Sequence, residues 1–144
     1  MKWNEVKDDK DTAQLNEVYS WFEDAVIVSM GYVSGNSVDG ELFGHMEMKN
    51  DLRVVFQRLD NEPFSIELWF YHTKHMNLVF TNPADNRMAD IMEAKVCRND
   101  ESVFWTVWKD FDPYDPENLD GTMLIEAEGL RWRVVRDKAE DNDE

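Results

Sequence analysis

The chain has 144 residues, with 15 basic and 31 acidic side chains, a formal net charge of −16 and one cysteine. This length is typical of one domain with an ordinary hydrophobic core. A negative field of this size repels nucleic acid, whose binding depends on Lys and Arg at the phosphates, and one cysteine excludes an internal disulfide framework. We therefore expect no nucleic-acid partner.

The sequence predicts a cytoplasmic protein with no membrane contact. No stretch approaches the roughly 18 consecutive apolar residues of a membrane span, and residues 1–8 lack the apolar segment of a signal peptide. The acidity fits two interpretations, which remain open at this point. It favours solubility, and it would also speed association with a basic protein partner.

Residues 11–22 predict a short helix near the N-terminus. Asp11 and Gln14 have the spacing of a capping box, in which two side chains satisfy free amides of the first helical turn. An apolar stripe at positions i, i+3, i+4 and i+7 follows, formed by Leu15, Val18, Tyr19 and Phe22. We expect a helix at about residues 12–21.

The next fifty residues predict strands joined by turns. A strong strand at 25–33 is followed by a turn-rich loop at 34–40 and a weaker strand at 41–48. Residues 52–58 and 64–71 then alternate apolar and polar side chains around a turn at 60–63, as expected of an antiparallel hairpin.

The stretch 64–71 is the clearest strand of the chain. We expect one apolar face of this stretch to be buried together with one face of the preceding strand. The first face consists of Phe64, Ile66, Leu68 and Phe70, and the second of Leu52, Val54 and Phe56. Trp69 and Tyr71 lie on the opposite face, where a solvated strand would carry short polar side chains. That second face is therefore either covered or a contact surface.

The second half of the chain continues the β pattern. We expect strands at 76–80 and 102–109, a strand over the second half of the ambiguous segment 88–96, and an exposed loop at 110–121. The last strand region spans 122–135. Its apolar residues change parity at Gly129, which predicts a β-bulge or tight turn there.

One helix followed by seven or eight short strands indicates a mainly β fold. We expect an antiparallel β-sandwich or barrel-like sheet with one short N-terminal helix. The alternative is an α+β fold, with the helix on one face of a single curved sheet. Residues 1–136 form the predicted domain. Residues 137–144 are acidic without a large apolar side chain, which predicts a disordered tail.

The sequence carries no motif for catalysis, a metal or a cofactor. His72 and His75 would point to opposite faces of a continuous strand, and no third ligand has zinc-like spacing. The loop at 110–120 is rich in carboxylates, but Tyr114 and Asp115 stand where a calcium loop of the EF type needs a ligand and a glycine. We therefore expect no catalytic residues, no metal site and no cofactor.

Aromatic residues and the acidic loop supply the candidate binding residues. The rings could form a binding face rimmed by acids that suits a cationic protein surface, or they could be core residues. The candidates are Trp69, Tyr71, Trp105 and Trp108, with the loop acids Asp110, Asp112, Asp115, Glu117 and Asp120. Trp132 belongs to the same aromatic set.

Two segments carry a resemblance to a known group of proteins. Residues 21–25, Trp-Phe-Glu-Asp-Ala, precede an apolar strand, and the closing strand at 125–132 ends in Leu-Arg-Trp. In this the chain resembles a loose group of small bacterial β-rich proteins, some of which are grouped with immunity proteins of polymorphic toxin systems. Members often begin with Phe-His-Asp-Ala, and Glu23 stands here at the position of that His. The resemblance implies an antiparallel β fold and an inhibitor of a toxin.

Two functions follow as hypotheses. The first is a non-enzymatic protein-binding module, in its most concrete form an immunity-type inhibitor whose acidic surface covers a basic toxin. The second is a small-ligand-binding or enzymatic β-domain with a pocket between sheets. A flat acidic face with exposed rings would favour the first, and a pocket of several hundred Å³ with convergent polar groups would favour the second.

Overall fold

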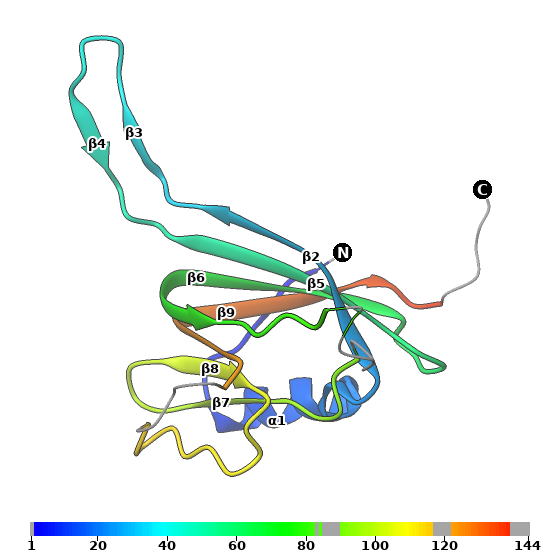
Figure 1. The fold of residues 1–144 in the computed structure, drawn as a ribbon. Coiled ribbons are helices and arrows are strands. Elements are labelled where there is room, and N and C mark those ends of the chain that lie inside the picture. Colours follow the sequence, from blue (N-terminus) through cyan, green and yellow to red (C-terminus); the bar gives the residue numbers. More distant parts are fainter. Residues whose placement is uncertain (1, 83, 85–89, 117–121, 139–144) are drawn as a thin grey trace.

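The computed structural model describes residues 2–82, 84, 90–116 and 122–138 (Figure 1). Within these residues it has one α-helix, α1 (Asp9–Val18), and a short 3-10 turn, η1 (Ser20–Phe22). The strands are β1 (Asn4–Glu5), β2 (Ala25–Val33), β3 (Asn36–Val38), β4 (Gly44–Met46), β5 (Asp51–Arg58), β6 (Ser65–Asn77), β7 (Lys95–Arg98), β8 (Val103–Thr106) and β9 (Leu124–Arg136). The predicted mainly β fold with one N-terminal helix is confirmed.

Helix α1 begins three residues earlier than the sequence predicts. Asp8 is the N-cap, and its carboxylate accepts a hydrogen bond from the amide of Asp11 at 2.9 Å. The carboxylate of Asp11 in turn accepts from the amide of Lys7 at 2.8 Å. The cap predicted at Asp11 and Gln14 is therefore formed by Asp8 and Asp11, and Asp11 reaches back to the amide of Lys7, one residue before the N-cap.

The predicted apolar stripe of the helical region is confirmed. Leu15, Tyr19 and Phe22 are fully buried, and Val18 packs against them half-buried. Helix α1 ends at Val18, and Phe22 is carried into the core by η1 instead of by a further helical turn.

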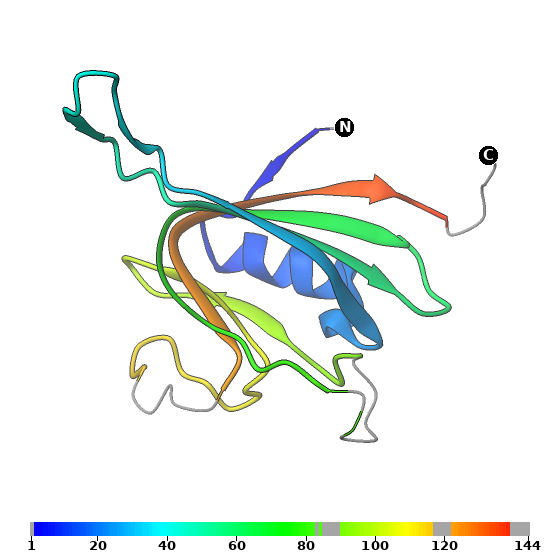
Figure 2. The ribbon, with the colours of Figure 1, turned by 45° about the horizontal axis from the view of Figure 1, so that its top comes forward.

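The strands form one strongly curved antiparallel sheet. Its order is β2-β5-β6-β9-β8-β7, and β1 pairs with the free part of β9. The two longest strands, β6 and β9, have 13 residues each and pair along their length. Figure 2 shows both of them bending around α1, with β7 and β8 below the helix, and Figure 1 shows β2 and β5 above it. The architecture is a single barrel-like sheet with the helix on its concave side.

The bend in β6 and β9 changes one sequence expectation. Gly129 lies inside β9 opposite Tyr71, and the nearer of the two register shifts of this pair falls in the partner strand, between Thr73 and His75. His72, next to that shift, has a positive φ of 52°. The extra residue that restores the apolar face is therefore in β6. Gly129 has a different role, since its lack of a side chain leaves room for the Tyr71 ring.

The core lies between the concave face of the sheet and α1. Side chains of β5 alternate between half-buried and buried along the whole strand. The predicted core residues Leu52, Val54, Phe56, Ile66, Leu68 and Phe70 are all fully or nearly fully buried. Phe64 is half-buried, because it stands in the turn just before β6. Both faces of β8 are also buried: Phe104 joins a second, smaller cluster with Phe111 and Leu124.

Several strand boundaries differ from the sequence expectation. The strand expected at 76–80 is the end of β6, which runs on to Asn77, and residues 78–80 form no strand. The loop expected at 34–40 contains β3, and the strand expected at 41–48 shortens to β4. The predicted tail is tied at its start, where the carbonyl of Asp137 accepts from the amide of Phe64 at 2.8 Å. The rest of that prediction, at residues 139–144, lies outside the described residues.

No helix among the described residues is long and apolar enough to cross a membrane.

Candidate interaction surface

Trp69 and Tyr71 lie on the convex face of the sheet, where arginines cover their rings. The guanidinium carbon of Arg53 is 4.9 Å from the centroid of the Trp69 ring, and that of Arg131 is 4.6 Å from it on the neighbouring strand. Arg131 is also 4.6 Å from the Tyr71 ring. The indole of Trp3 packs edge-on against Trp69 with centroids 5.3 Å apart. Trp69 and Tyr71, which the sequence offered as binding residues, are therefore half-buried, with arginine guanidinium groups packed against their rings.

A buried carboxylate organises this convex face. Glu67 is 8% exposed and bonds the Nε of Arg53 at 2.9 Å and a terminal guanidinium nitrogen of Arg133 at 2.8 Å. The hydroxyl of Tyr71 donates to Glu5. Burial, followed by this hydrogen bond to Glu5, raises the pKa of Tyr71. Glu67 is therefore paired with two arginines. The rings of this face are bordered by arginines, whereas the sequence suggested acids.

Trp105 is a core residue. It is 0% exposed and its ring packs against Phe56 and Phe22, at centroid distances of 5.6 Å and 6.0 Å. The binding role expected of Trp105 is therefore wrong, because no partner can reach a fully enclosed ring. Trp132 is likewise buried, at the concave side of β9.

Trp108 and the acidic loop, which follow β8 in the chain, form a region separate from the convex face. The Trp108 ring is half-buried, 5.9 Å from that of Phe111. Asp110, Asp112 and Asp115 are all exposed. Glu117 and Asp120 lie outside the described residues.

Local bonds hold this acidic loop against the domain. Lys95 donates to the carbonyls of Lys109 and Phe111 at 2.9 Å and 2.8 Å, and Asn99 donates to that of Pro113 at 2.7 Å. Among the described residues, no three His, Cys, Asp or Glu side chains are grouped to hold a metal ion. The predicted site residues therefore fall into three separate places: the convex face, the core and this loop.

A hairpin whose projection from the sheet the sequence did not suggest is the most prominent surface feature. Between β2 and β5 the chain leaves the sheet as a projecting arm, residues 34–50, built on β3 and β4 (Figures 1 and 2). The amides of Lys49 and Asn50 donate to the carbonyl of Ser34, at 2.8 Å and 3.1 Å. Gly35 has a φ of +81°, and a side chain there would press on Lys49. These contacts fix the base of the arm.

The tip of the arm is ordered by its own polar groups. The carboxylate of Asp39 accepts from the amides of Glu41 and Phe43, at 2.9 Å and 3.0 Å, and bonds the ring of His45 at 2.9 Å. These bonds lower the pKa of Asp39, the one to His45 having the largest effect. The Asp39 side chain therefore remains an anion while it closes the turn.

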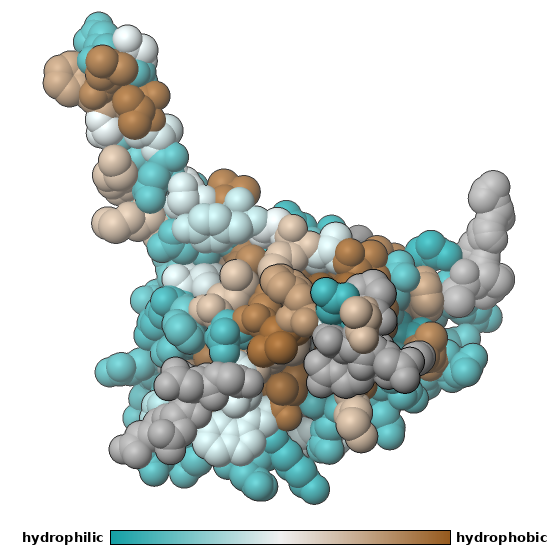
Figure 3. Space-filling model, in the orientation of Figure 1, coloured by the Kyte–Doolittle hydropathy of each residue, from teal (hydrophilic) through white to brown (hydrophobic). Residues whose placement is uncertain are grey.

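Apolar side chains of the arm face solvent. Leu42 is 83% exposed and Phe43 is 66% exposed, although each is large enough to belong in a core. Three further exposed apolar residues lie on the arm: Val38, Met46 and Met48. Figure 3 shows hydrophobic residues gathered at the far end of the arm. Such a cluster on a projecting element is typical of a contact surface, because solvated hairpins ordinarily carry polar side chains.

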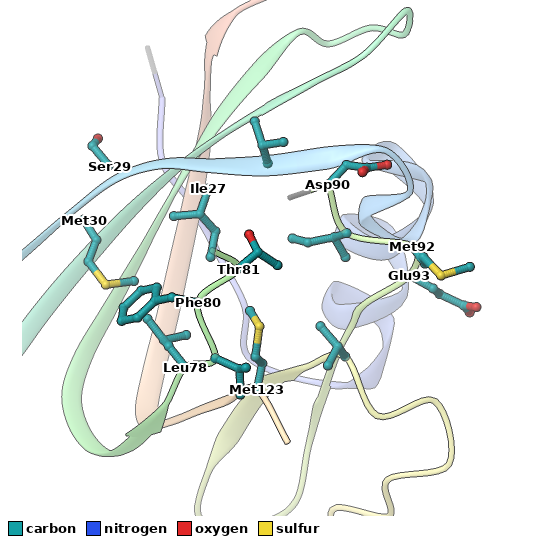
Figure 4. A pocket seen from close by; sticks show the side chains of 14 residues that line it. Ile27, Ser29, Met30, Leu78, Phe80, Thr81, Asp90, Met92, Glu93 and Met123 are labelled. Carbon is teal, nitrogen blue, oxygen red and sulfur yellow. The ribbon is translucent and has the colours of Figure 1, made fainter. Parts of the chain in front are cut away.

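An apolar pocket of about 620 Å³ lies at the open edge of the curved sheet. One wall is β2, and the others are residues 78–81 and 90–93, with Val107 and Met123 beneath (Figure 4). Its size falls in the roughly 300–1,000 Å³ range of small-molecule sites. Its lining is mainly apolar, and its polar members are Ser29, Thr81, Asp90 and Glu93.

No family model, no curated protein and no solved structure matches this chain.

Proposed function

We propose that this protein is a binding module that docks onto a basic protein partner through its projecting arm. The exposure of Leu42 and Phe43 at the tip carries the proposal, because neither side chain contributes to the core of the domain. A few side chains that enter well-packed pockets of the partner supply most of the binding energy in protein interfaces, and these two are placed to do so.

The negative charge of the arm and of the whole chain indicates that the partner is basic. The arm carries Asp39, Glu41 and Glu47 against a single lysine, Lys49, which is itself 3.4 Å from Glu47. A second copy of a chain with a net charge of −16 would be repelled, whereas a basic surface would be drawn in. An apolar groove rimmed by Lys or Arg is the surface that fits this arm.

An immunity-type inhibitor of a basic toxin is the most concrete form of this function. It combines the resemblance carried by residues 21–25 and 125–132 with the acidity of the chain and the arm. In this role the arm would occupy a groove of the toxin, and the negative field of the domain would speed the encounter.

Site-specific photo-crosslinking in the native cell tests the proposal, because it captures whichever protein contacts a chosen position. A benzophenone amino acid replaces Phe43 in one variant and Leu59 in another, because both are exposed apolar positions and Leu59 lies in the turn between β5 and β6. We expect position 43, and not position 59, to capture one basic protein.

Binding of that protein, once purified, decides the outcome. We expect its association rate to fall steeply as salt is raised through the physiological range, where charges more than about 8 Å apart are screened. A crosslink between two copies of this chain would overturn the proposal and make the arm a self-association element. A rate that does not respond to salt would exclude electrostatic capture.

A further inference from the structure

The pocket at the open edge of the sheet is separate from the arm and has a fixed wall. The amide of Ile91 donates to the carbonyl of Ala25 at 2.7 Å, and the amide of Asp24 donates to that of Ile91 at 2.9 Å. This pair of bonds forms an isolated β-bridge between the start of β2 and residues 90–93. Ile91 is buried, so the bridge holds that segment against β2 and keeps one end of the pocket closed.

The interior of the pocket suits an apolar body. Figure 4 shows Ile27, Met30, Leu78, Phe80 and Met123 directed toward a common space. Methionine side chains are flexible and polarizable, so walls that contain them adapt to ligands of irregular shape. Phe80 and Met92, at the rim, are among the most exposed apolar residues of the chain, and an occupant would cover them.

The charged groups among the described residues that line the pocket are all acidic, and Ser29 and Thr81 are its uncharged polar residues. Asp90 and Glu93 are the charged residues that line it, and Figure 4 shows them at separate places on the rim, with their carboxylates directed away from the apolar interior. No Lys, Arg or His is among the described residues that line the pocket. A protonated amine whose cationic end emerges from the cavity would meet carboxylates at its rim.

We propose that this pocket binds a small amphipathic amine, with its apolar body between β2 and residues 78–81 and its cationic end outside, at the rim that carries Asp90 and Glu93. The apolar volume supplies the affinity, and the two carboxylates select the sign of the head group. This site lies outside the arm and does not depend on the function proposed for the arm.

Calorimetric titration with two ligands of equal chain length tests the selection. Dodecylamine is a cation at neutral pH and dodecanoate is an anion, and both are used below the concentrations at which they form micelles. We expect dodecylamine to bind with 1:1 stoichiometry and roughly five- to tenfold more tightly than dodecanoate. Equal affinity for the two, or uptake without a defined stoichiometry, would overturn the proposal.

Matched charge variants separate the rim from the overall field of the protein. Asp90→Asn with Glu93→Gln should abolish the preference for the amine. Glu17→Gln with Glu128→Gln removes the same charge from two exposed positions that do not line the pocket, and should leave the preference unchanged. If both pairs reduce the preference equally, the amine is responding to net charge, and the assignment of its cationic end to the rim is wrong.

Matched filling variants locate the site. Ile27→Trp places an indole inside the pocket, and Val28→Trp makes a comparable change at the next, exposed position of β2, which does not line it. Ile27→Trp should weaken binding of both ligands at least about tenfold, and Val28→Trp should not. Met123→Trp provides a second filling variant if Ile27→Trp does not fold. Full binding by a folded filling variant would show that the ligand binds elsewhere.

Discussion

The ring of Tyr71 lies over Gly129, its partner across β6 and β9, in the space that a Cβ atom at position 129 would occupy. This contact lies two residues before the register shift of β6, which falls between Thr73 and His75. A glycine is required there because any side chain would displace the ring or the neighbouring strand.

Gly129→Ala should therefore reduce the free energy of unfolding by about 1–3 kcal/mol, the usual cost of overpacking. Gly31→Ala in β2 is the control, because a Cβ there meets nothing within 4 Å. Urea denaturation measures both variants. In a Tyr71→Ala background the cost of Gly129→Ala should shrink, and an unchanged cost would mean that the ring is not the obstacle.

Leu68 provides the corresponding test of the core. It is fully buried between β5 and β9, opposite Val54 and Trp132. Leu68→Ala should cost about 2–5 kcal/mol, since it removes buried methyl groups and leaves a cavity. Val135→Ala, at an exposed position of β9, should cost much less. A loss below about 1 kcal/mol for Leu68→Ala would contradict the assignment of the concave face.

Glu67 tests the network on the convex face. Glu67→Gln leaves Arg53 and Arg133 without their shared carboxylate, and we expect a loss of about 1–2 kcal/mol, because both arginines are only partly screened by solvent. Glu47→Gln removes a surface partner of Lys49 and should change stability by no more than about 0.5 kcal/mol. Chemical denaturation at neutral pH measures both. Equal effects would mean that the convex network contributes no more than an ordinary surface pair.

Cys97 leads to a prediction about how stability and thiol reactivity depend on pH. Burial, more than any neighbouring charge, raises the pKa of its thiol from 9.0 to about 11. Between these values the unfolded chain has lost the thiol proton and the folded chain still holds it, so this group's stabilising contribution falls as pH rises from 9 to 11. Alkylation by iodoacetamide should therefore be slow at pH 8 in the native state and fast in urea. Rapid native alkylation at pH 8 would contradict the burial of the thiol.

The hairpin of β5 and β6 could be predicted from the sequence because only one face of it enters the core. Leu52, Val54, Ile66 and Leu68 alternate with polar residues, and a period of two has one structural explanation. The cover over Trp69 could not be predicted in the same way. It depends on arginines from two other strands, and strand order is not encoded in local periodicity.

The sequence predicts a turn-rich loop and a strand in the region of the arm, but it does not predict that the arm projects from the sheet. Residues 34–40 carry glycine, serine, asparagine and aspartate, which predict a loop, and this composition does supply the turn. The signal that could have found the arm lies just beyond, in Leu42 and Phe43, two large apolar residues next to turn residues. The pocket gave no signal either, since residues 78–81 and 90–93 have no regular structure whose period could place them together.

The arm should be dispensable for folding, because its apolar tip contacts no core residue. A variant with Leu42→Ser, Phe43→Ser and Met46→Ser should keep the thermal midpoint of the native protein within about 2 °C, since exposed side chains far from the core contribute little to stability. Differential scanning calorimetry measures the midpoint. A large fall would mean that these residues support the fold.

The central claim is that Leu42, Phe43 and Met46 bind a partner. It is tested most directly by the affinity of the triple-serine variant for the basic protein captured at position 43. Biolayer interferometry should show a loss of at least about a hundredfold, mainly as faster dissociation, because buried apolar anchors slow release. Leu59→Ser should bind like the native protein. Native affinity in a folded triple-serine variant would contradict the account.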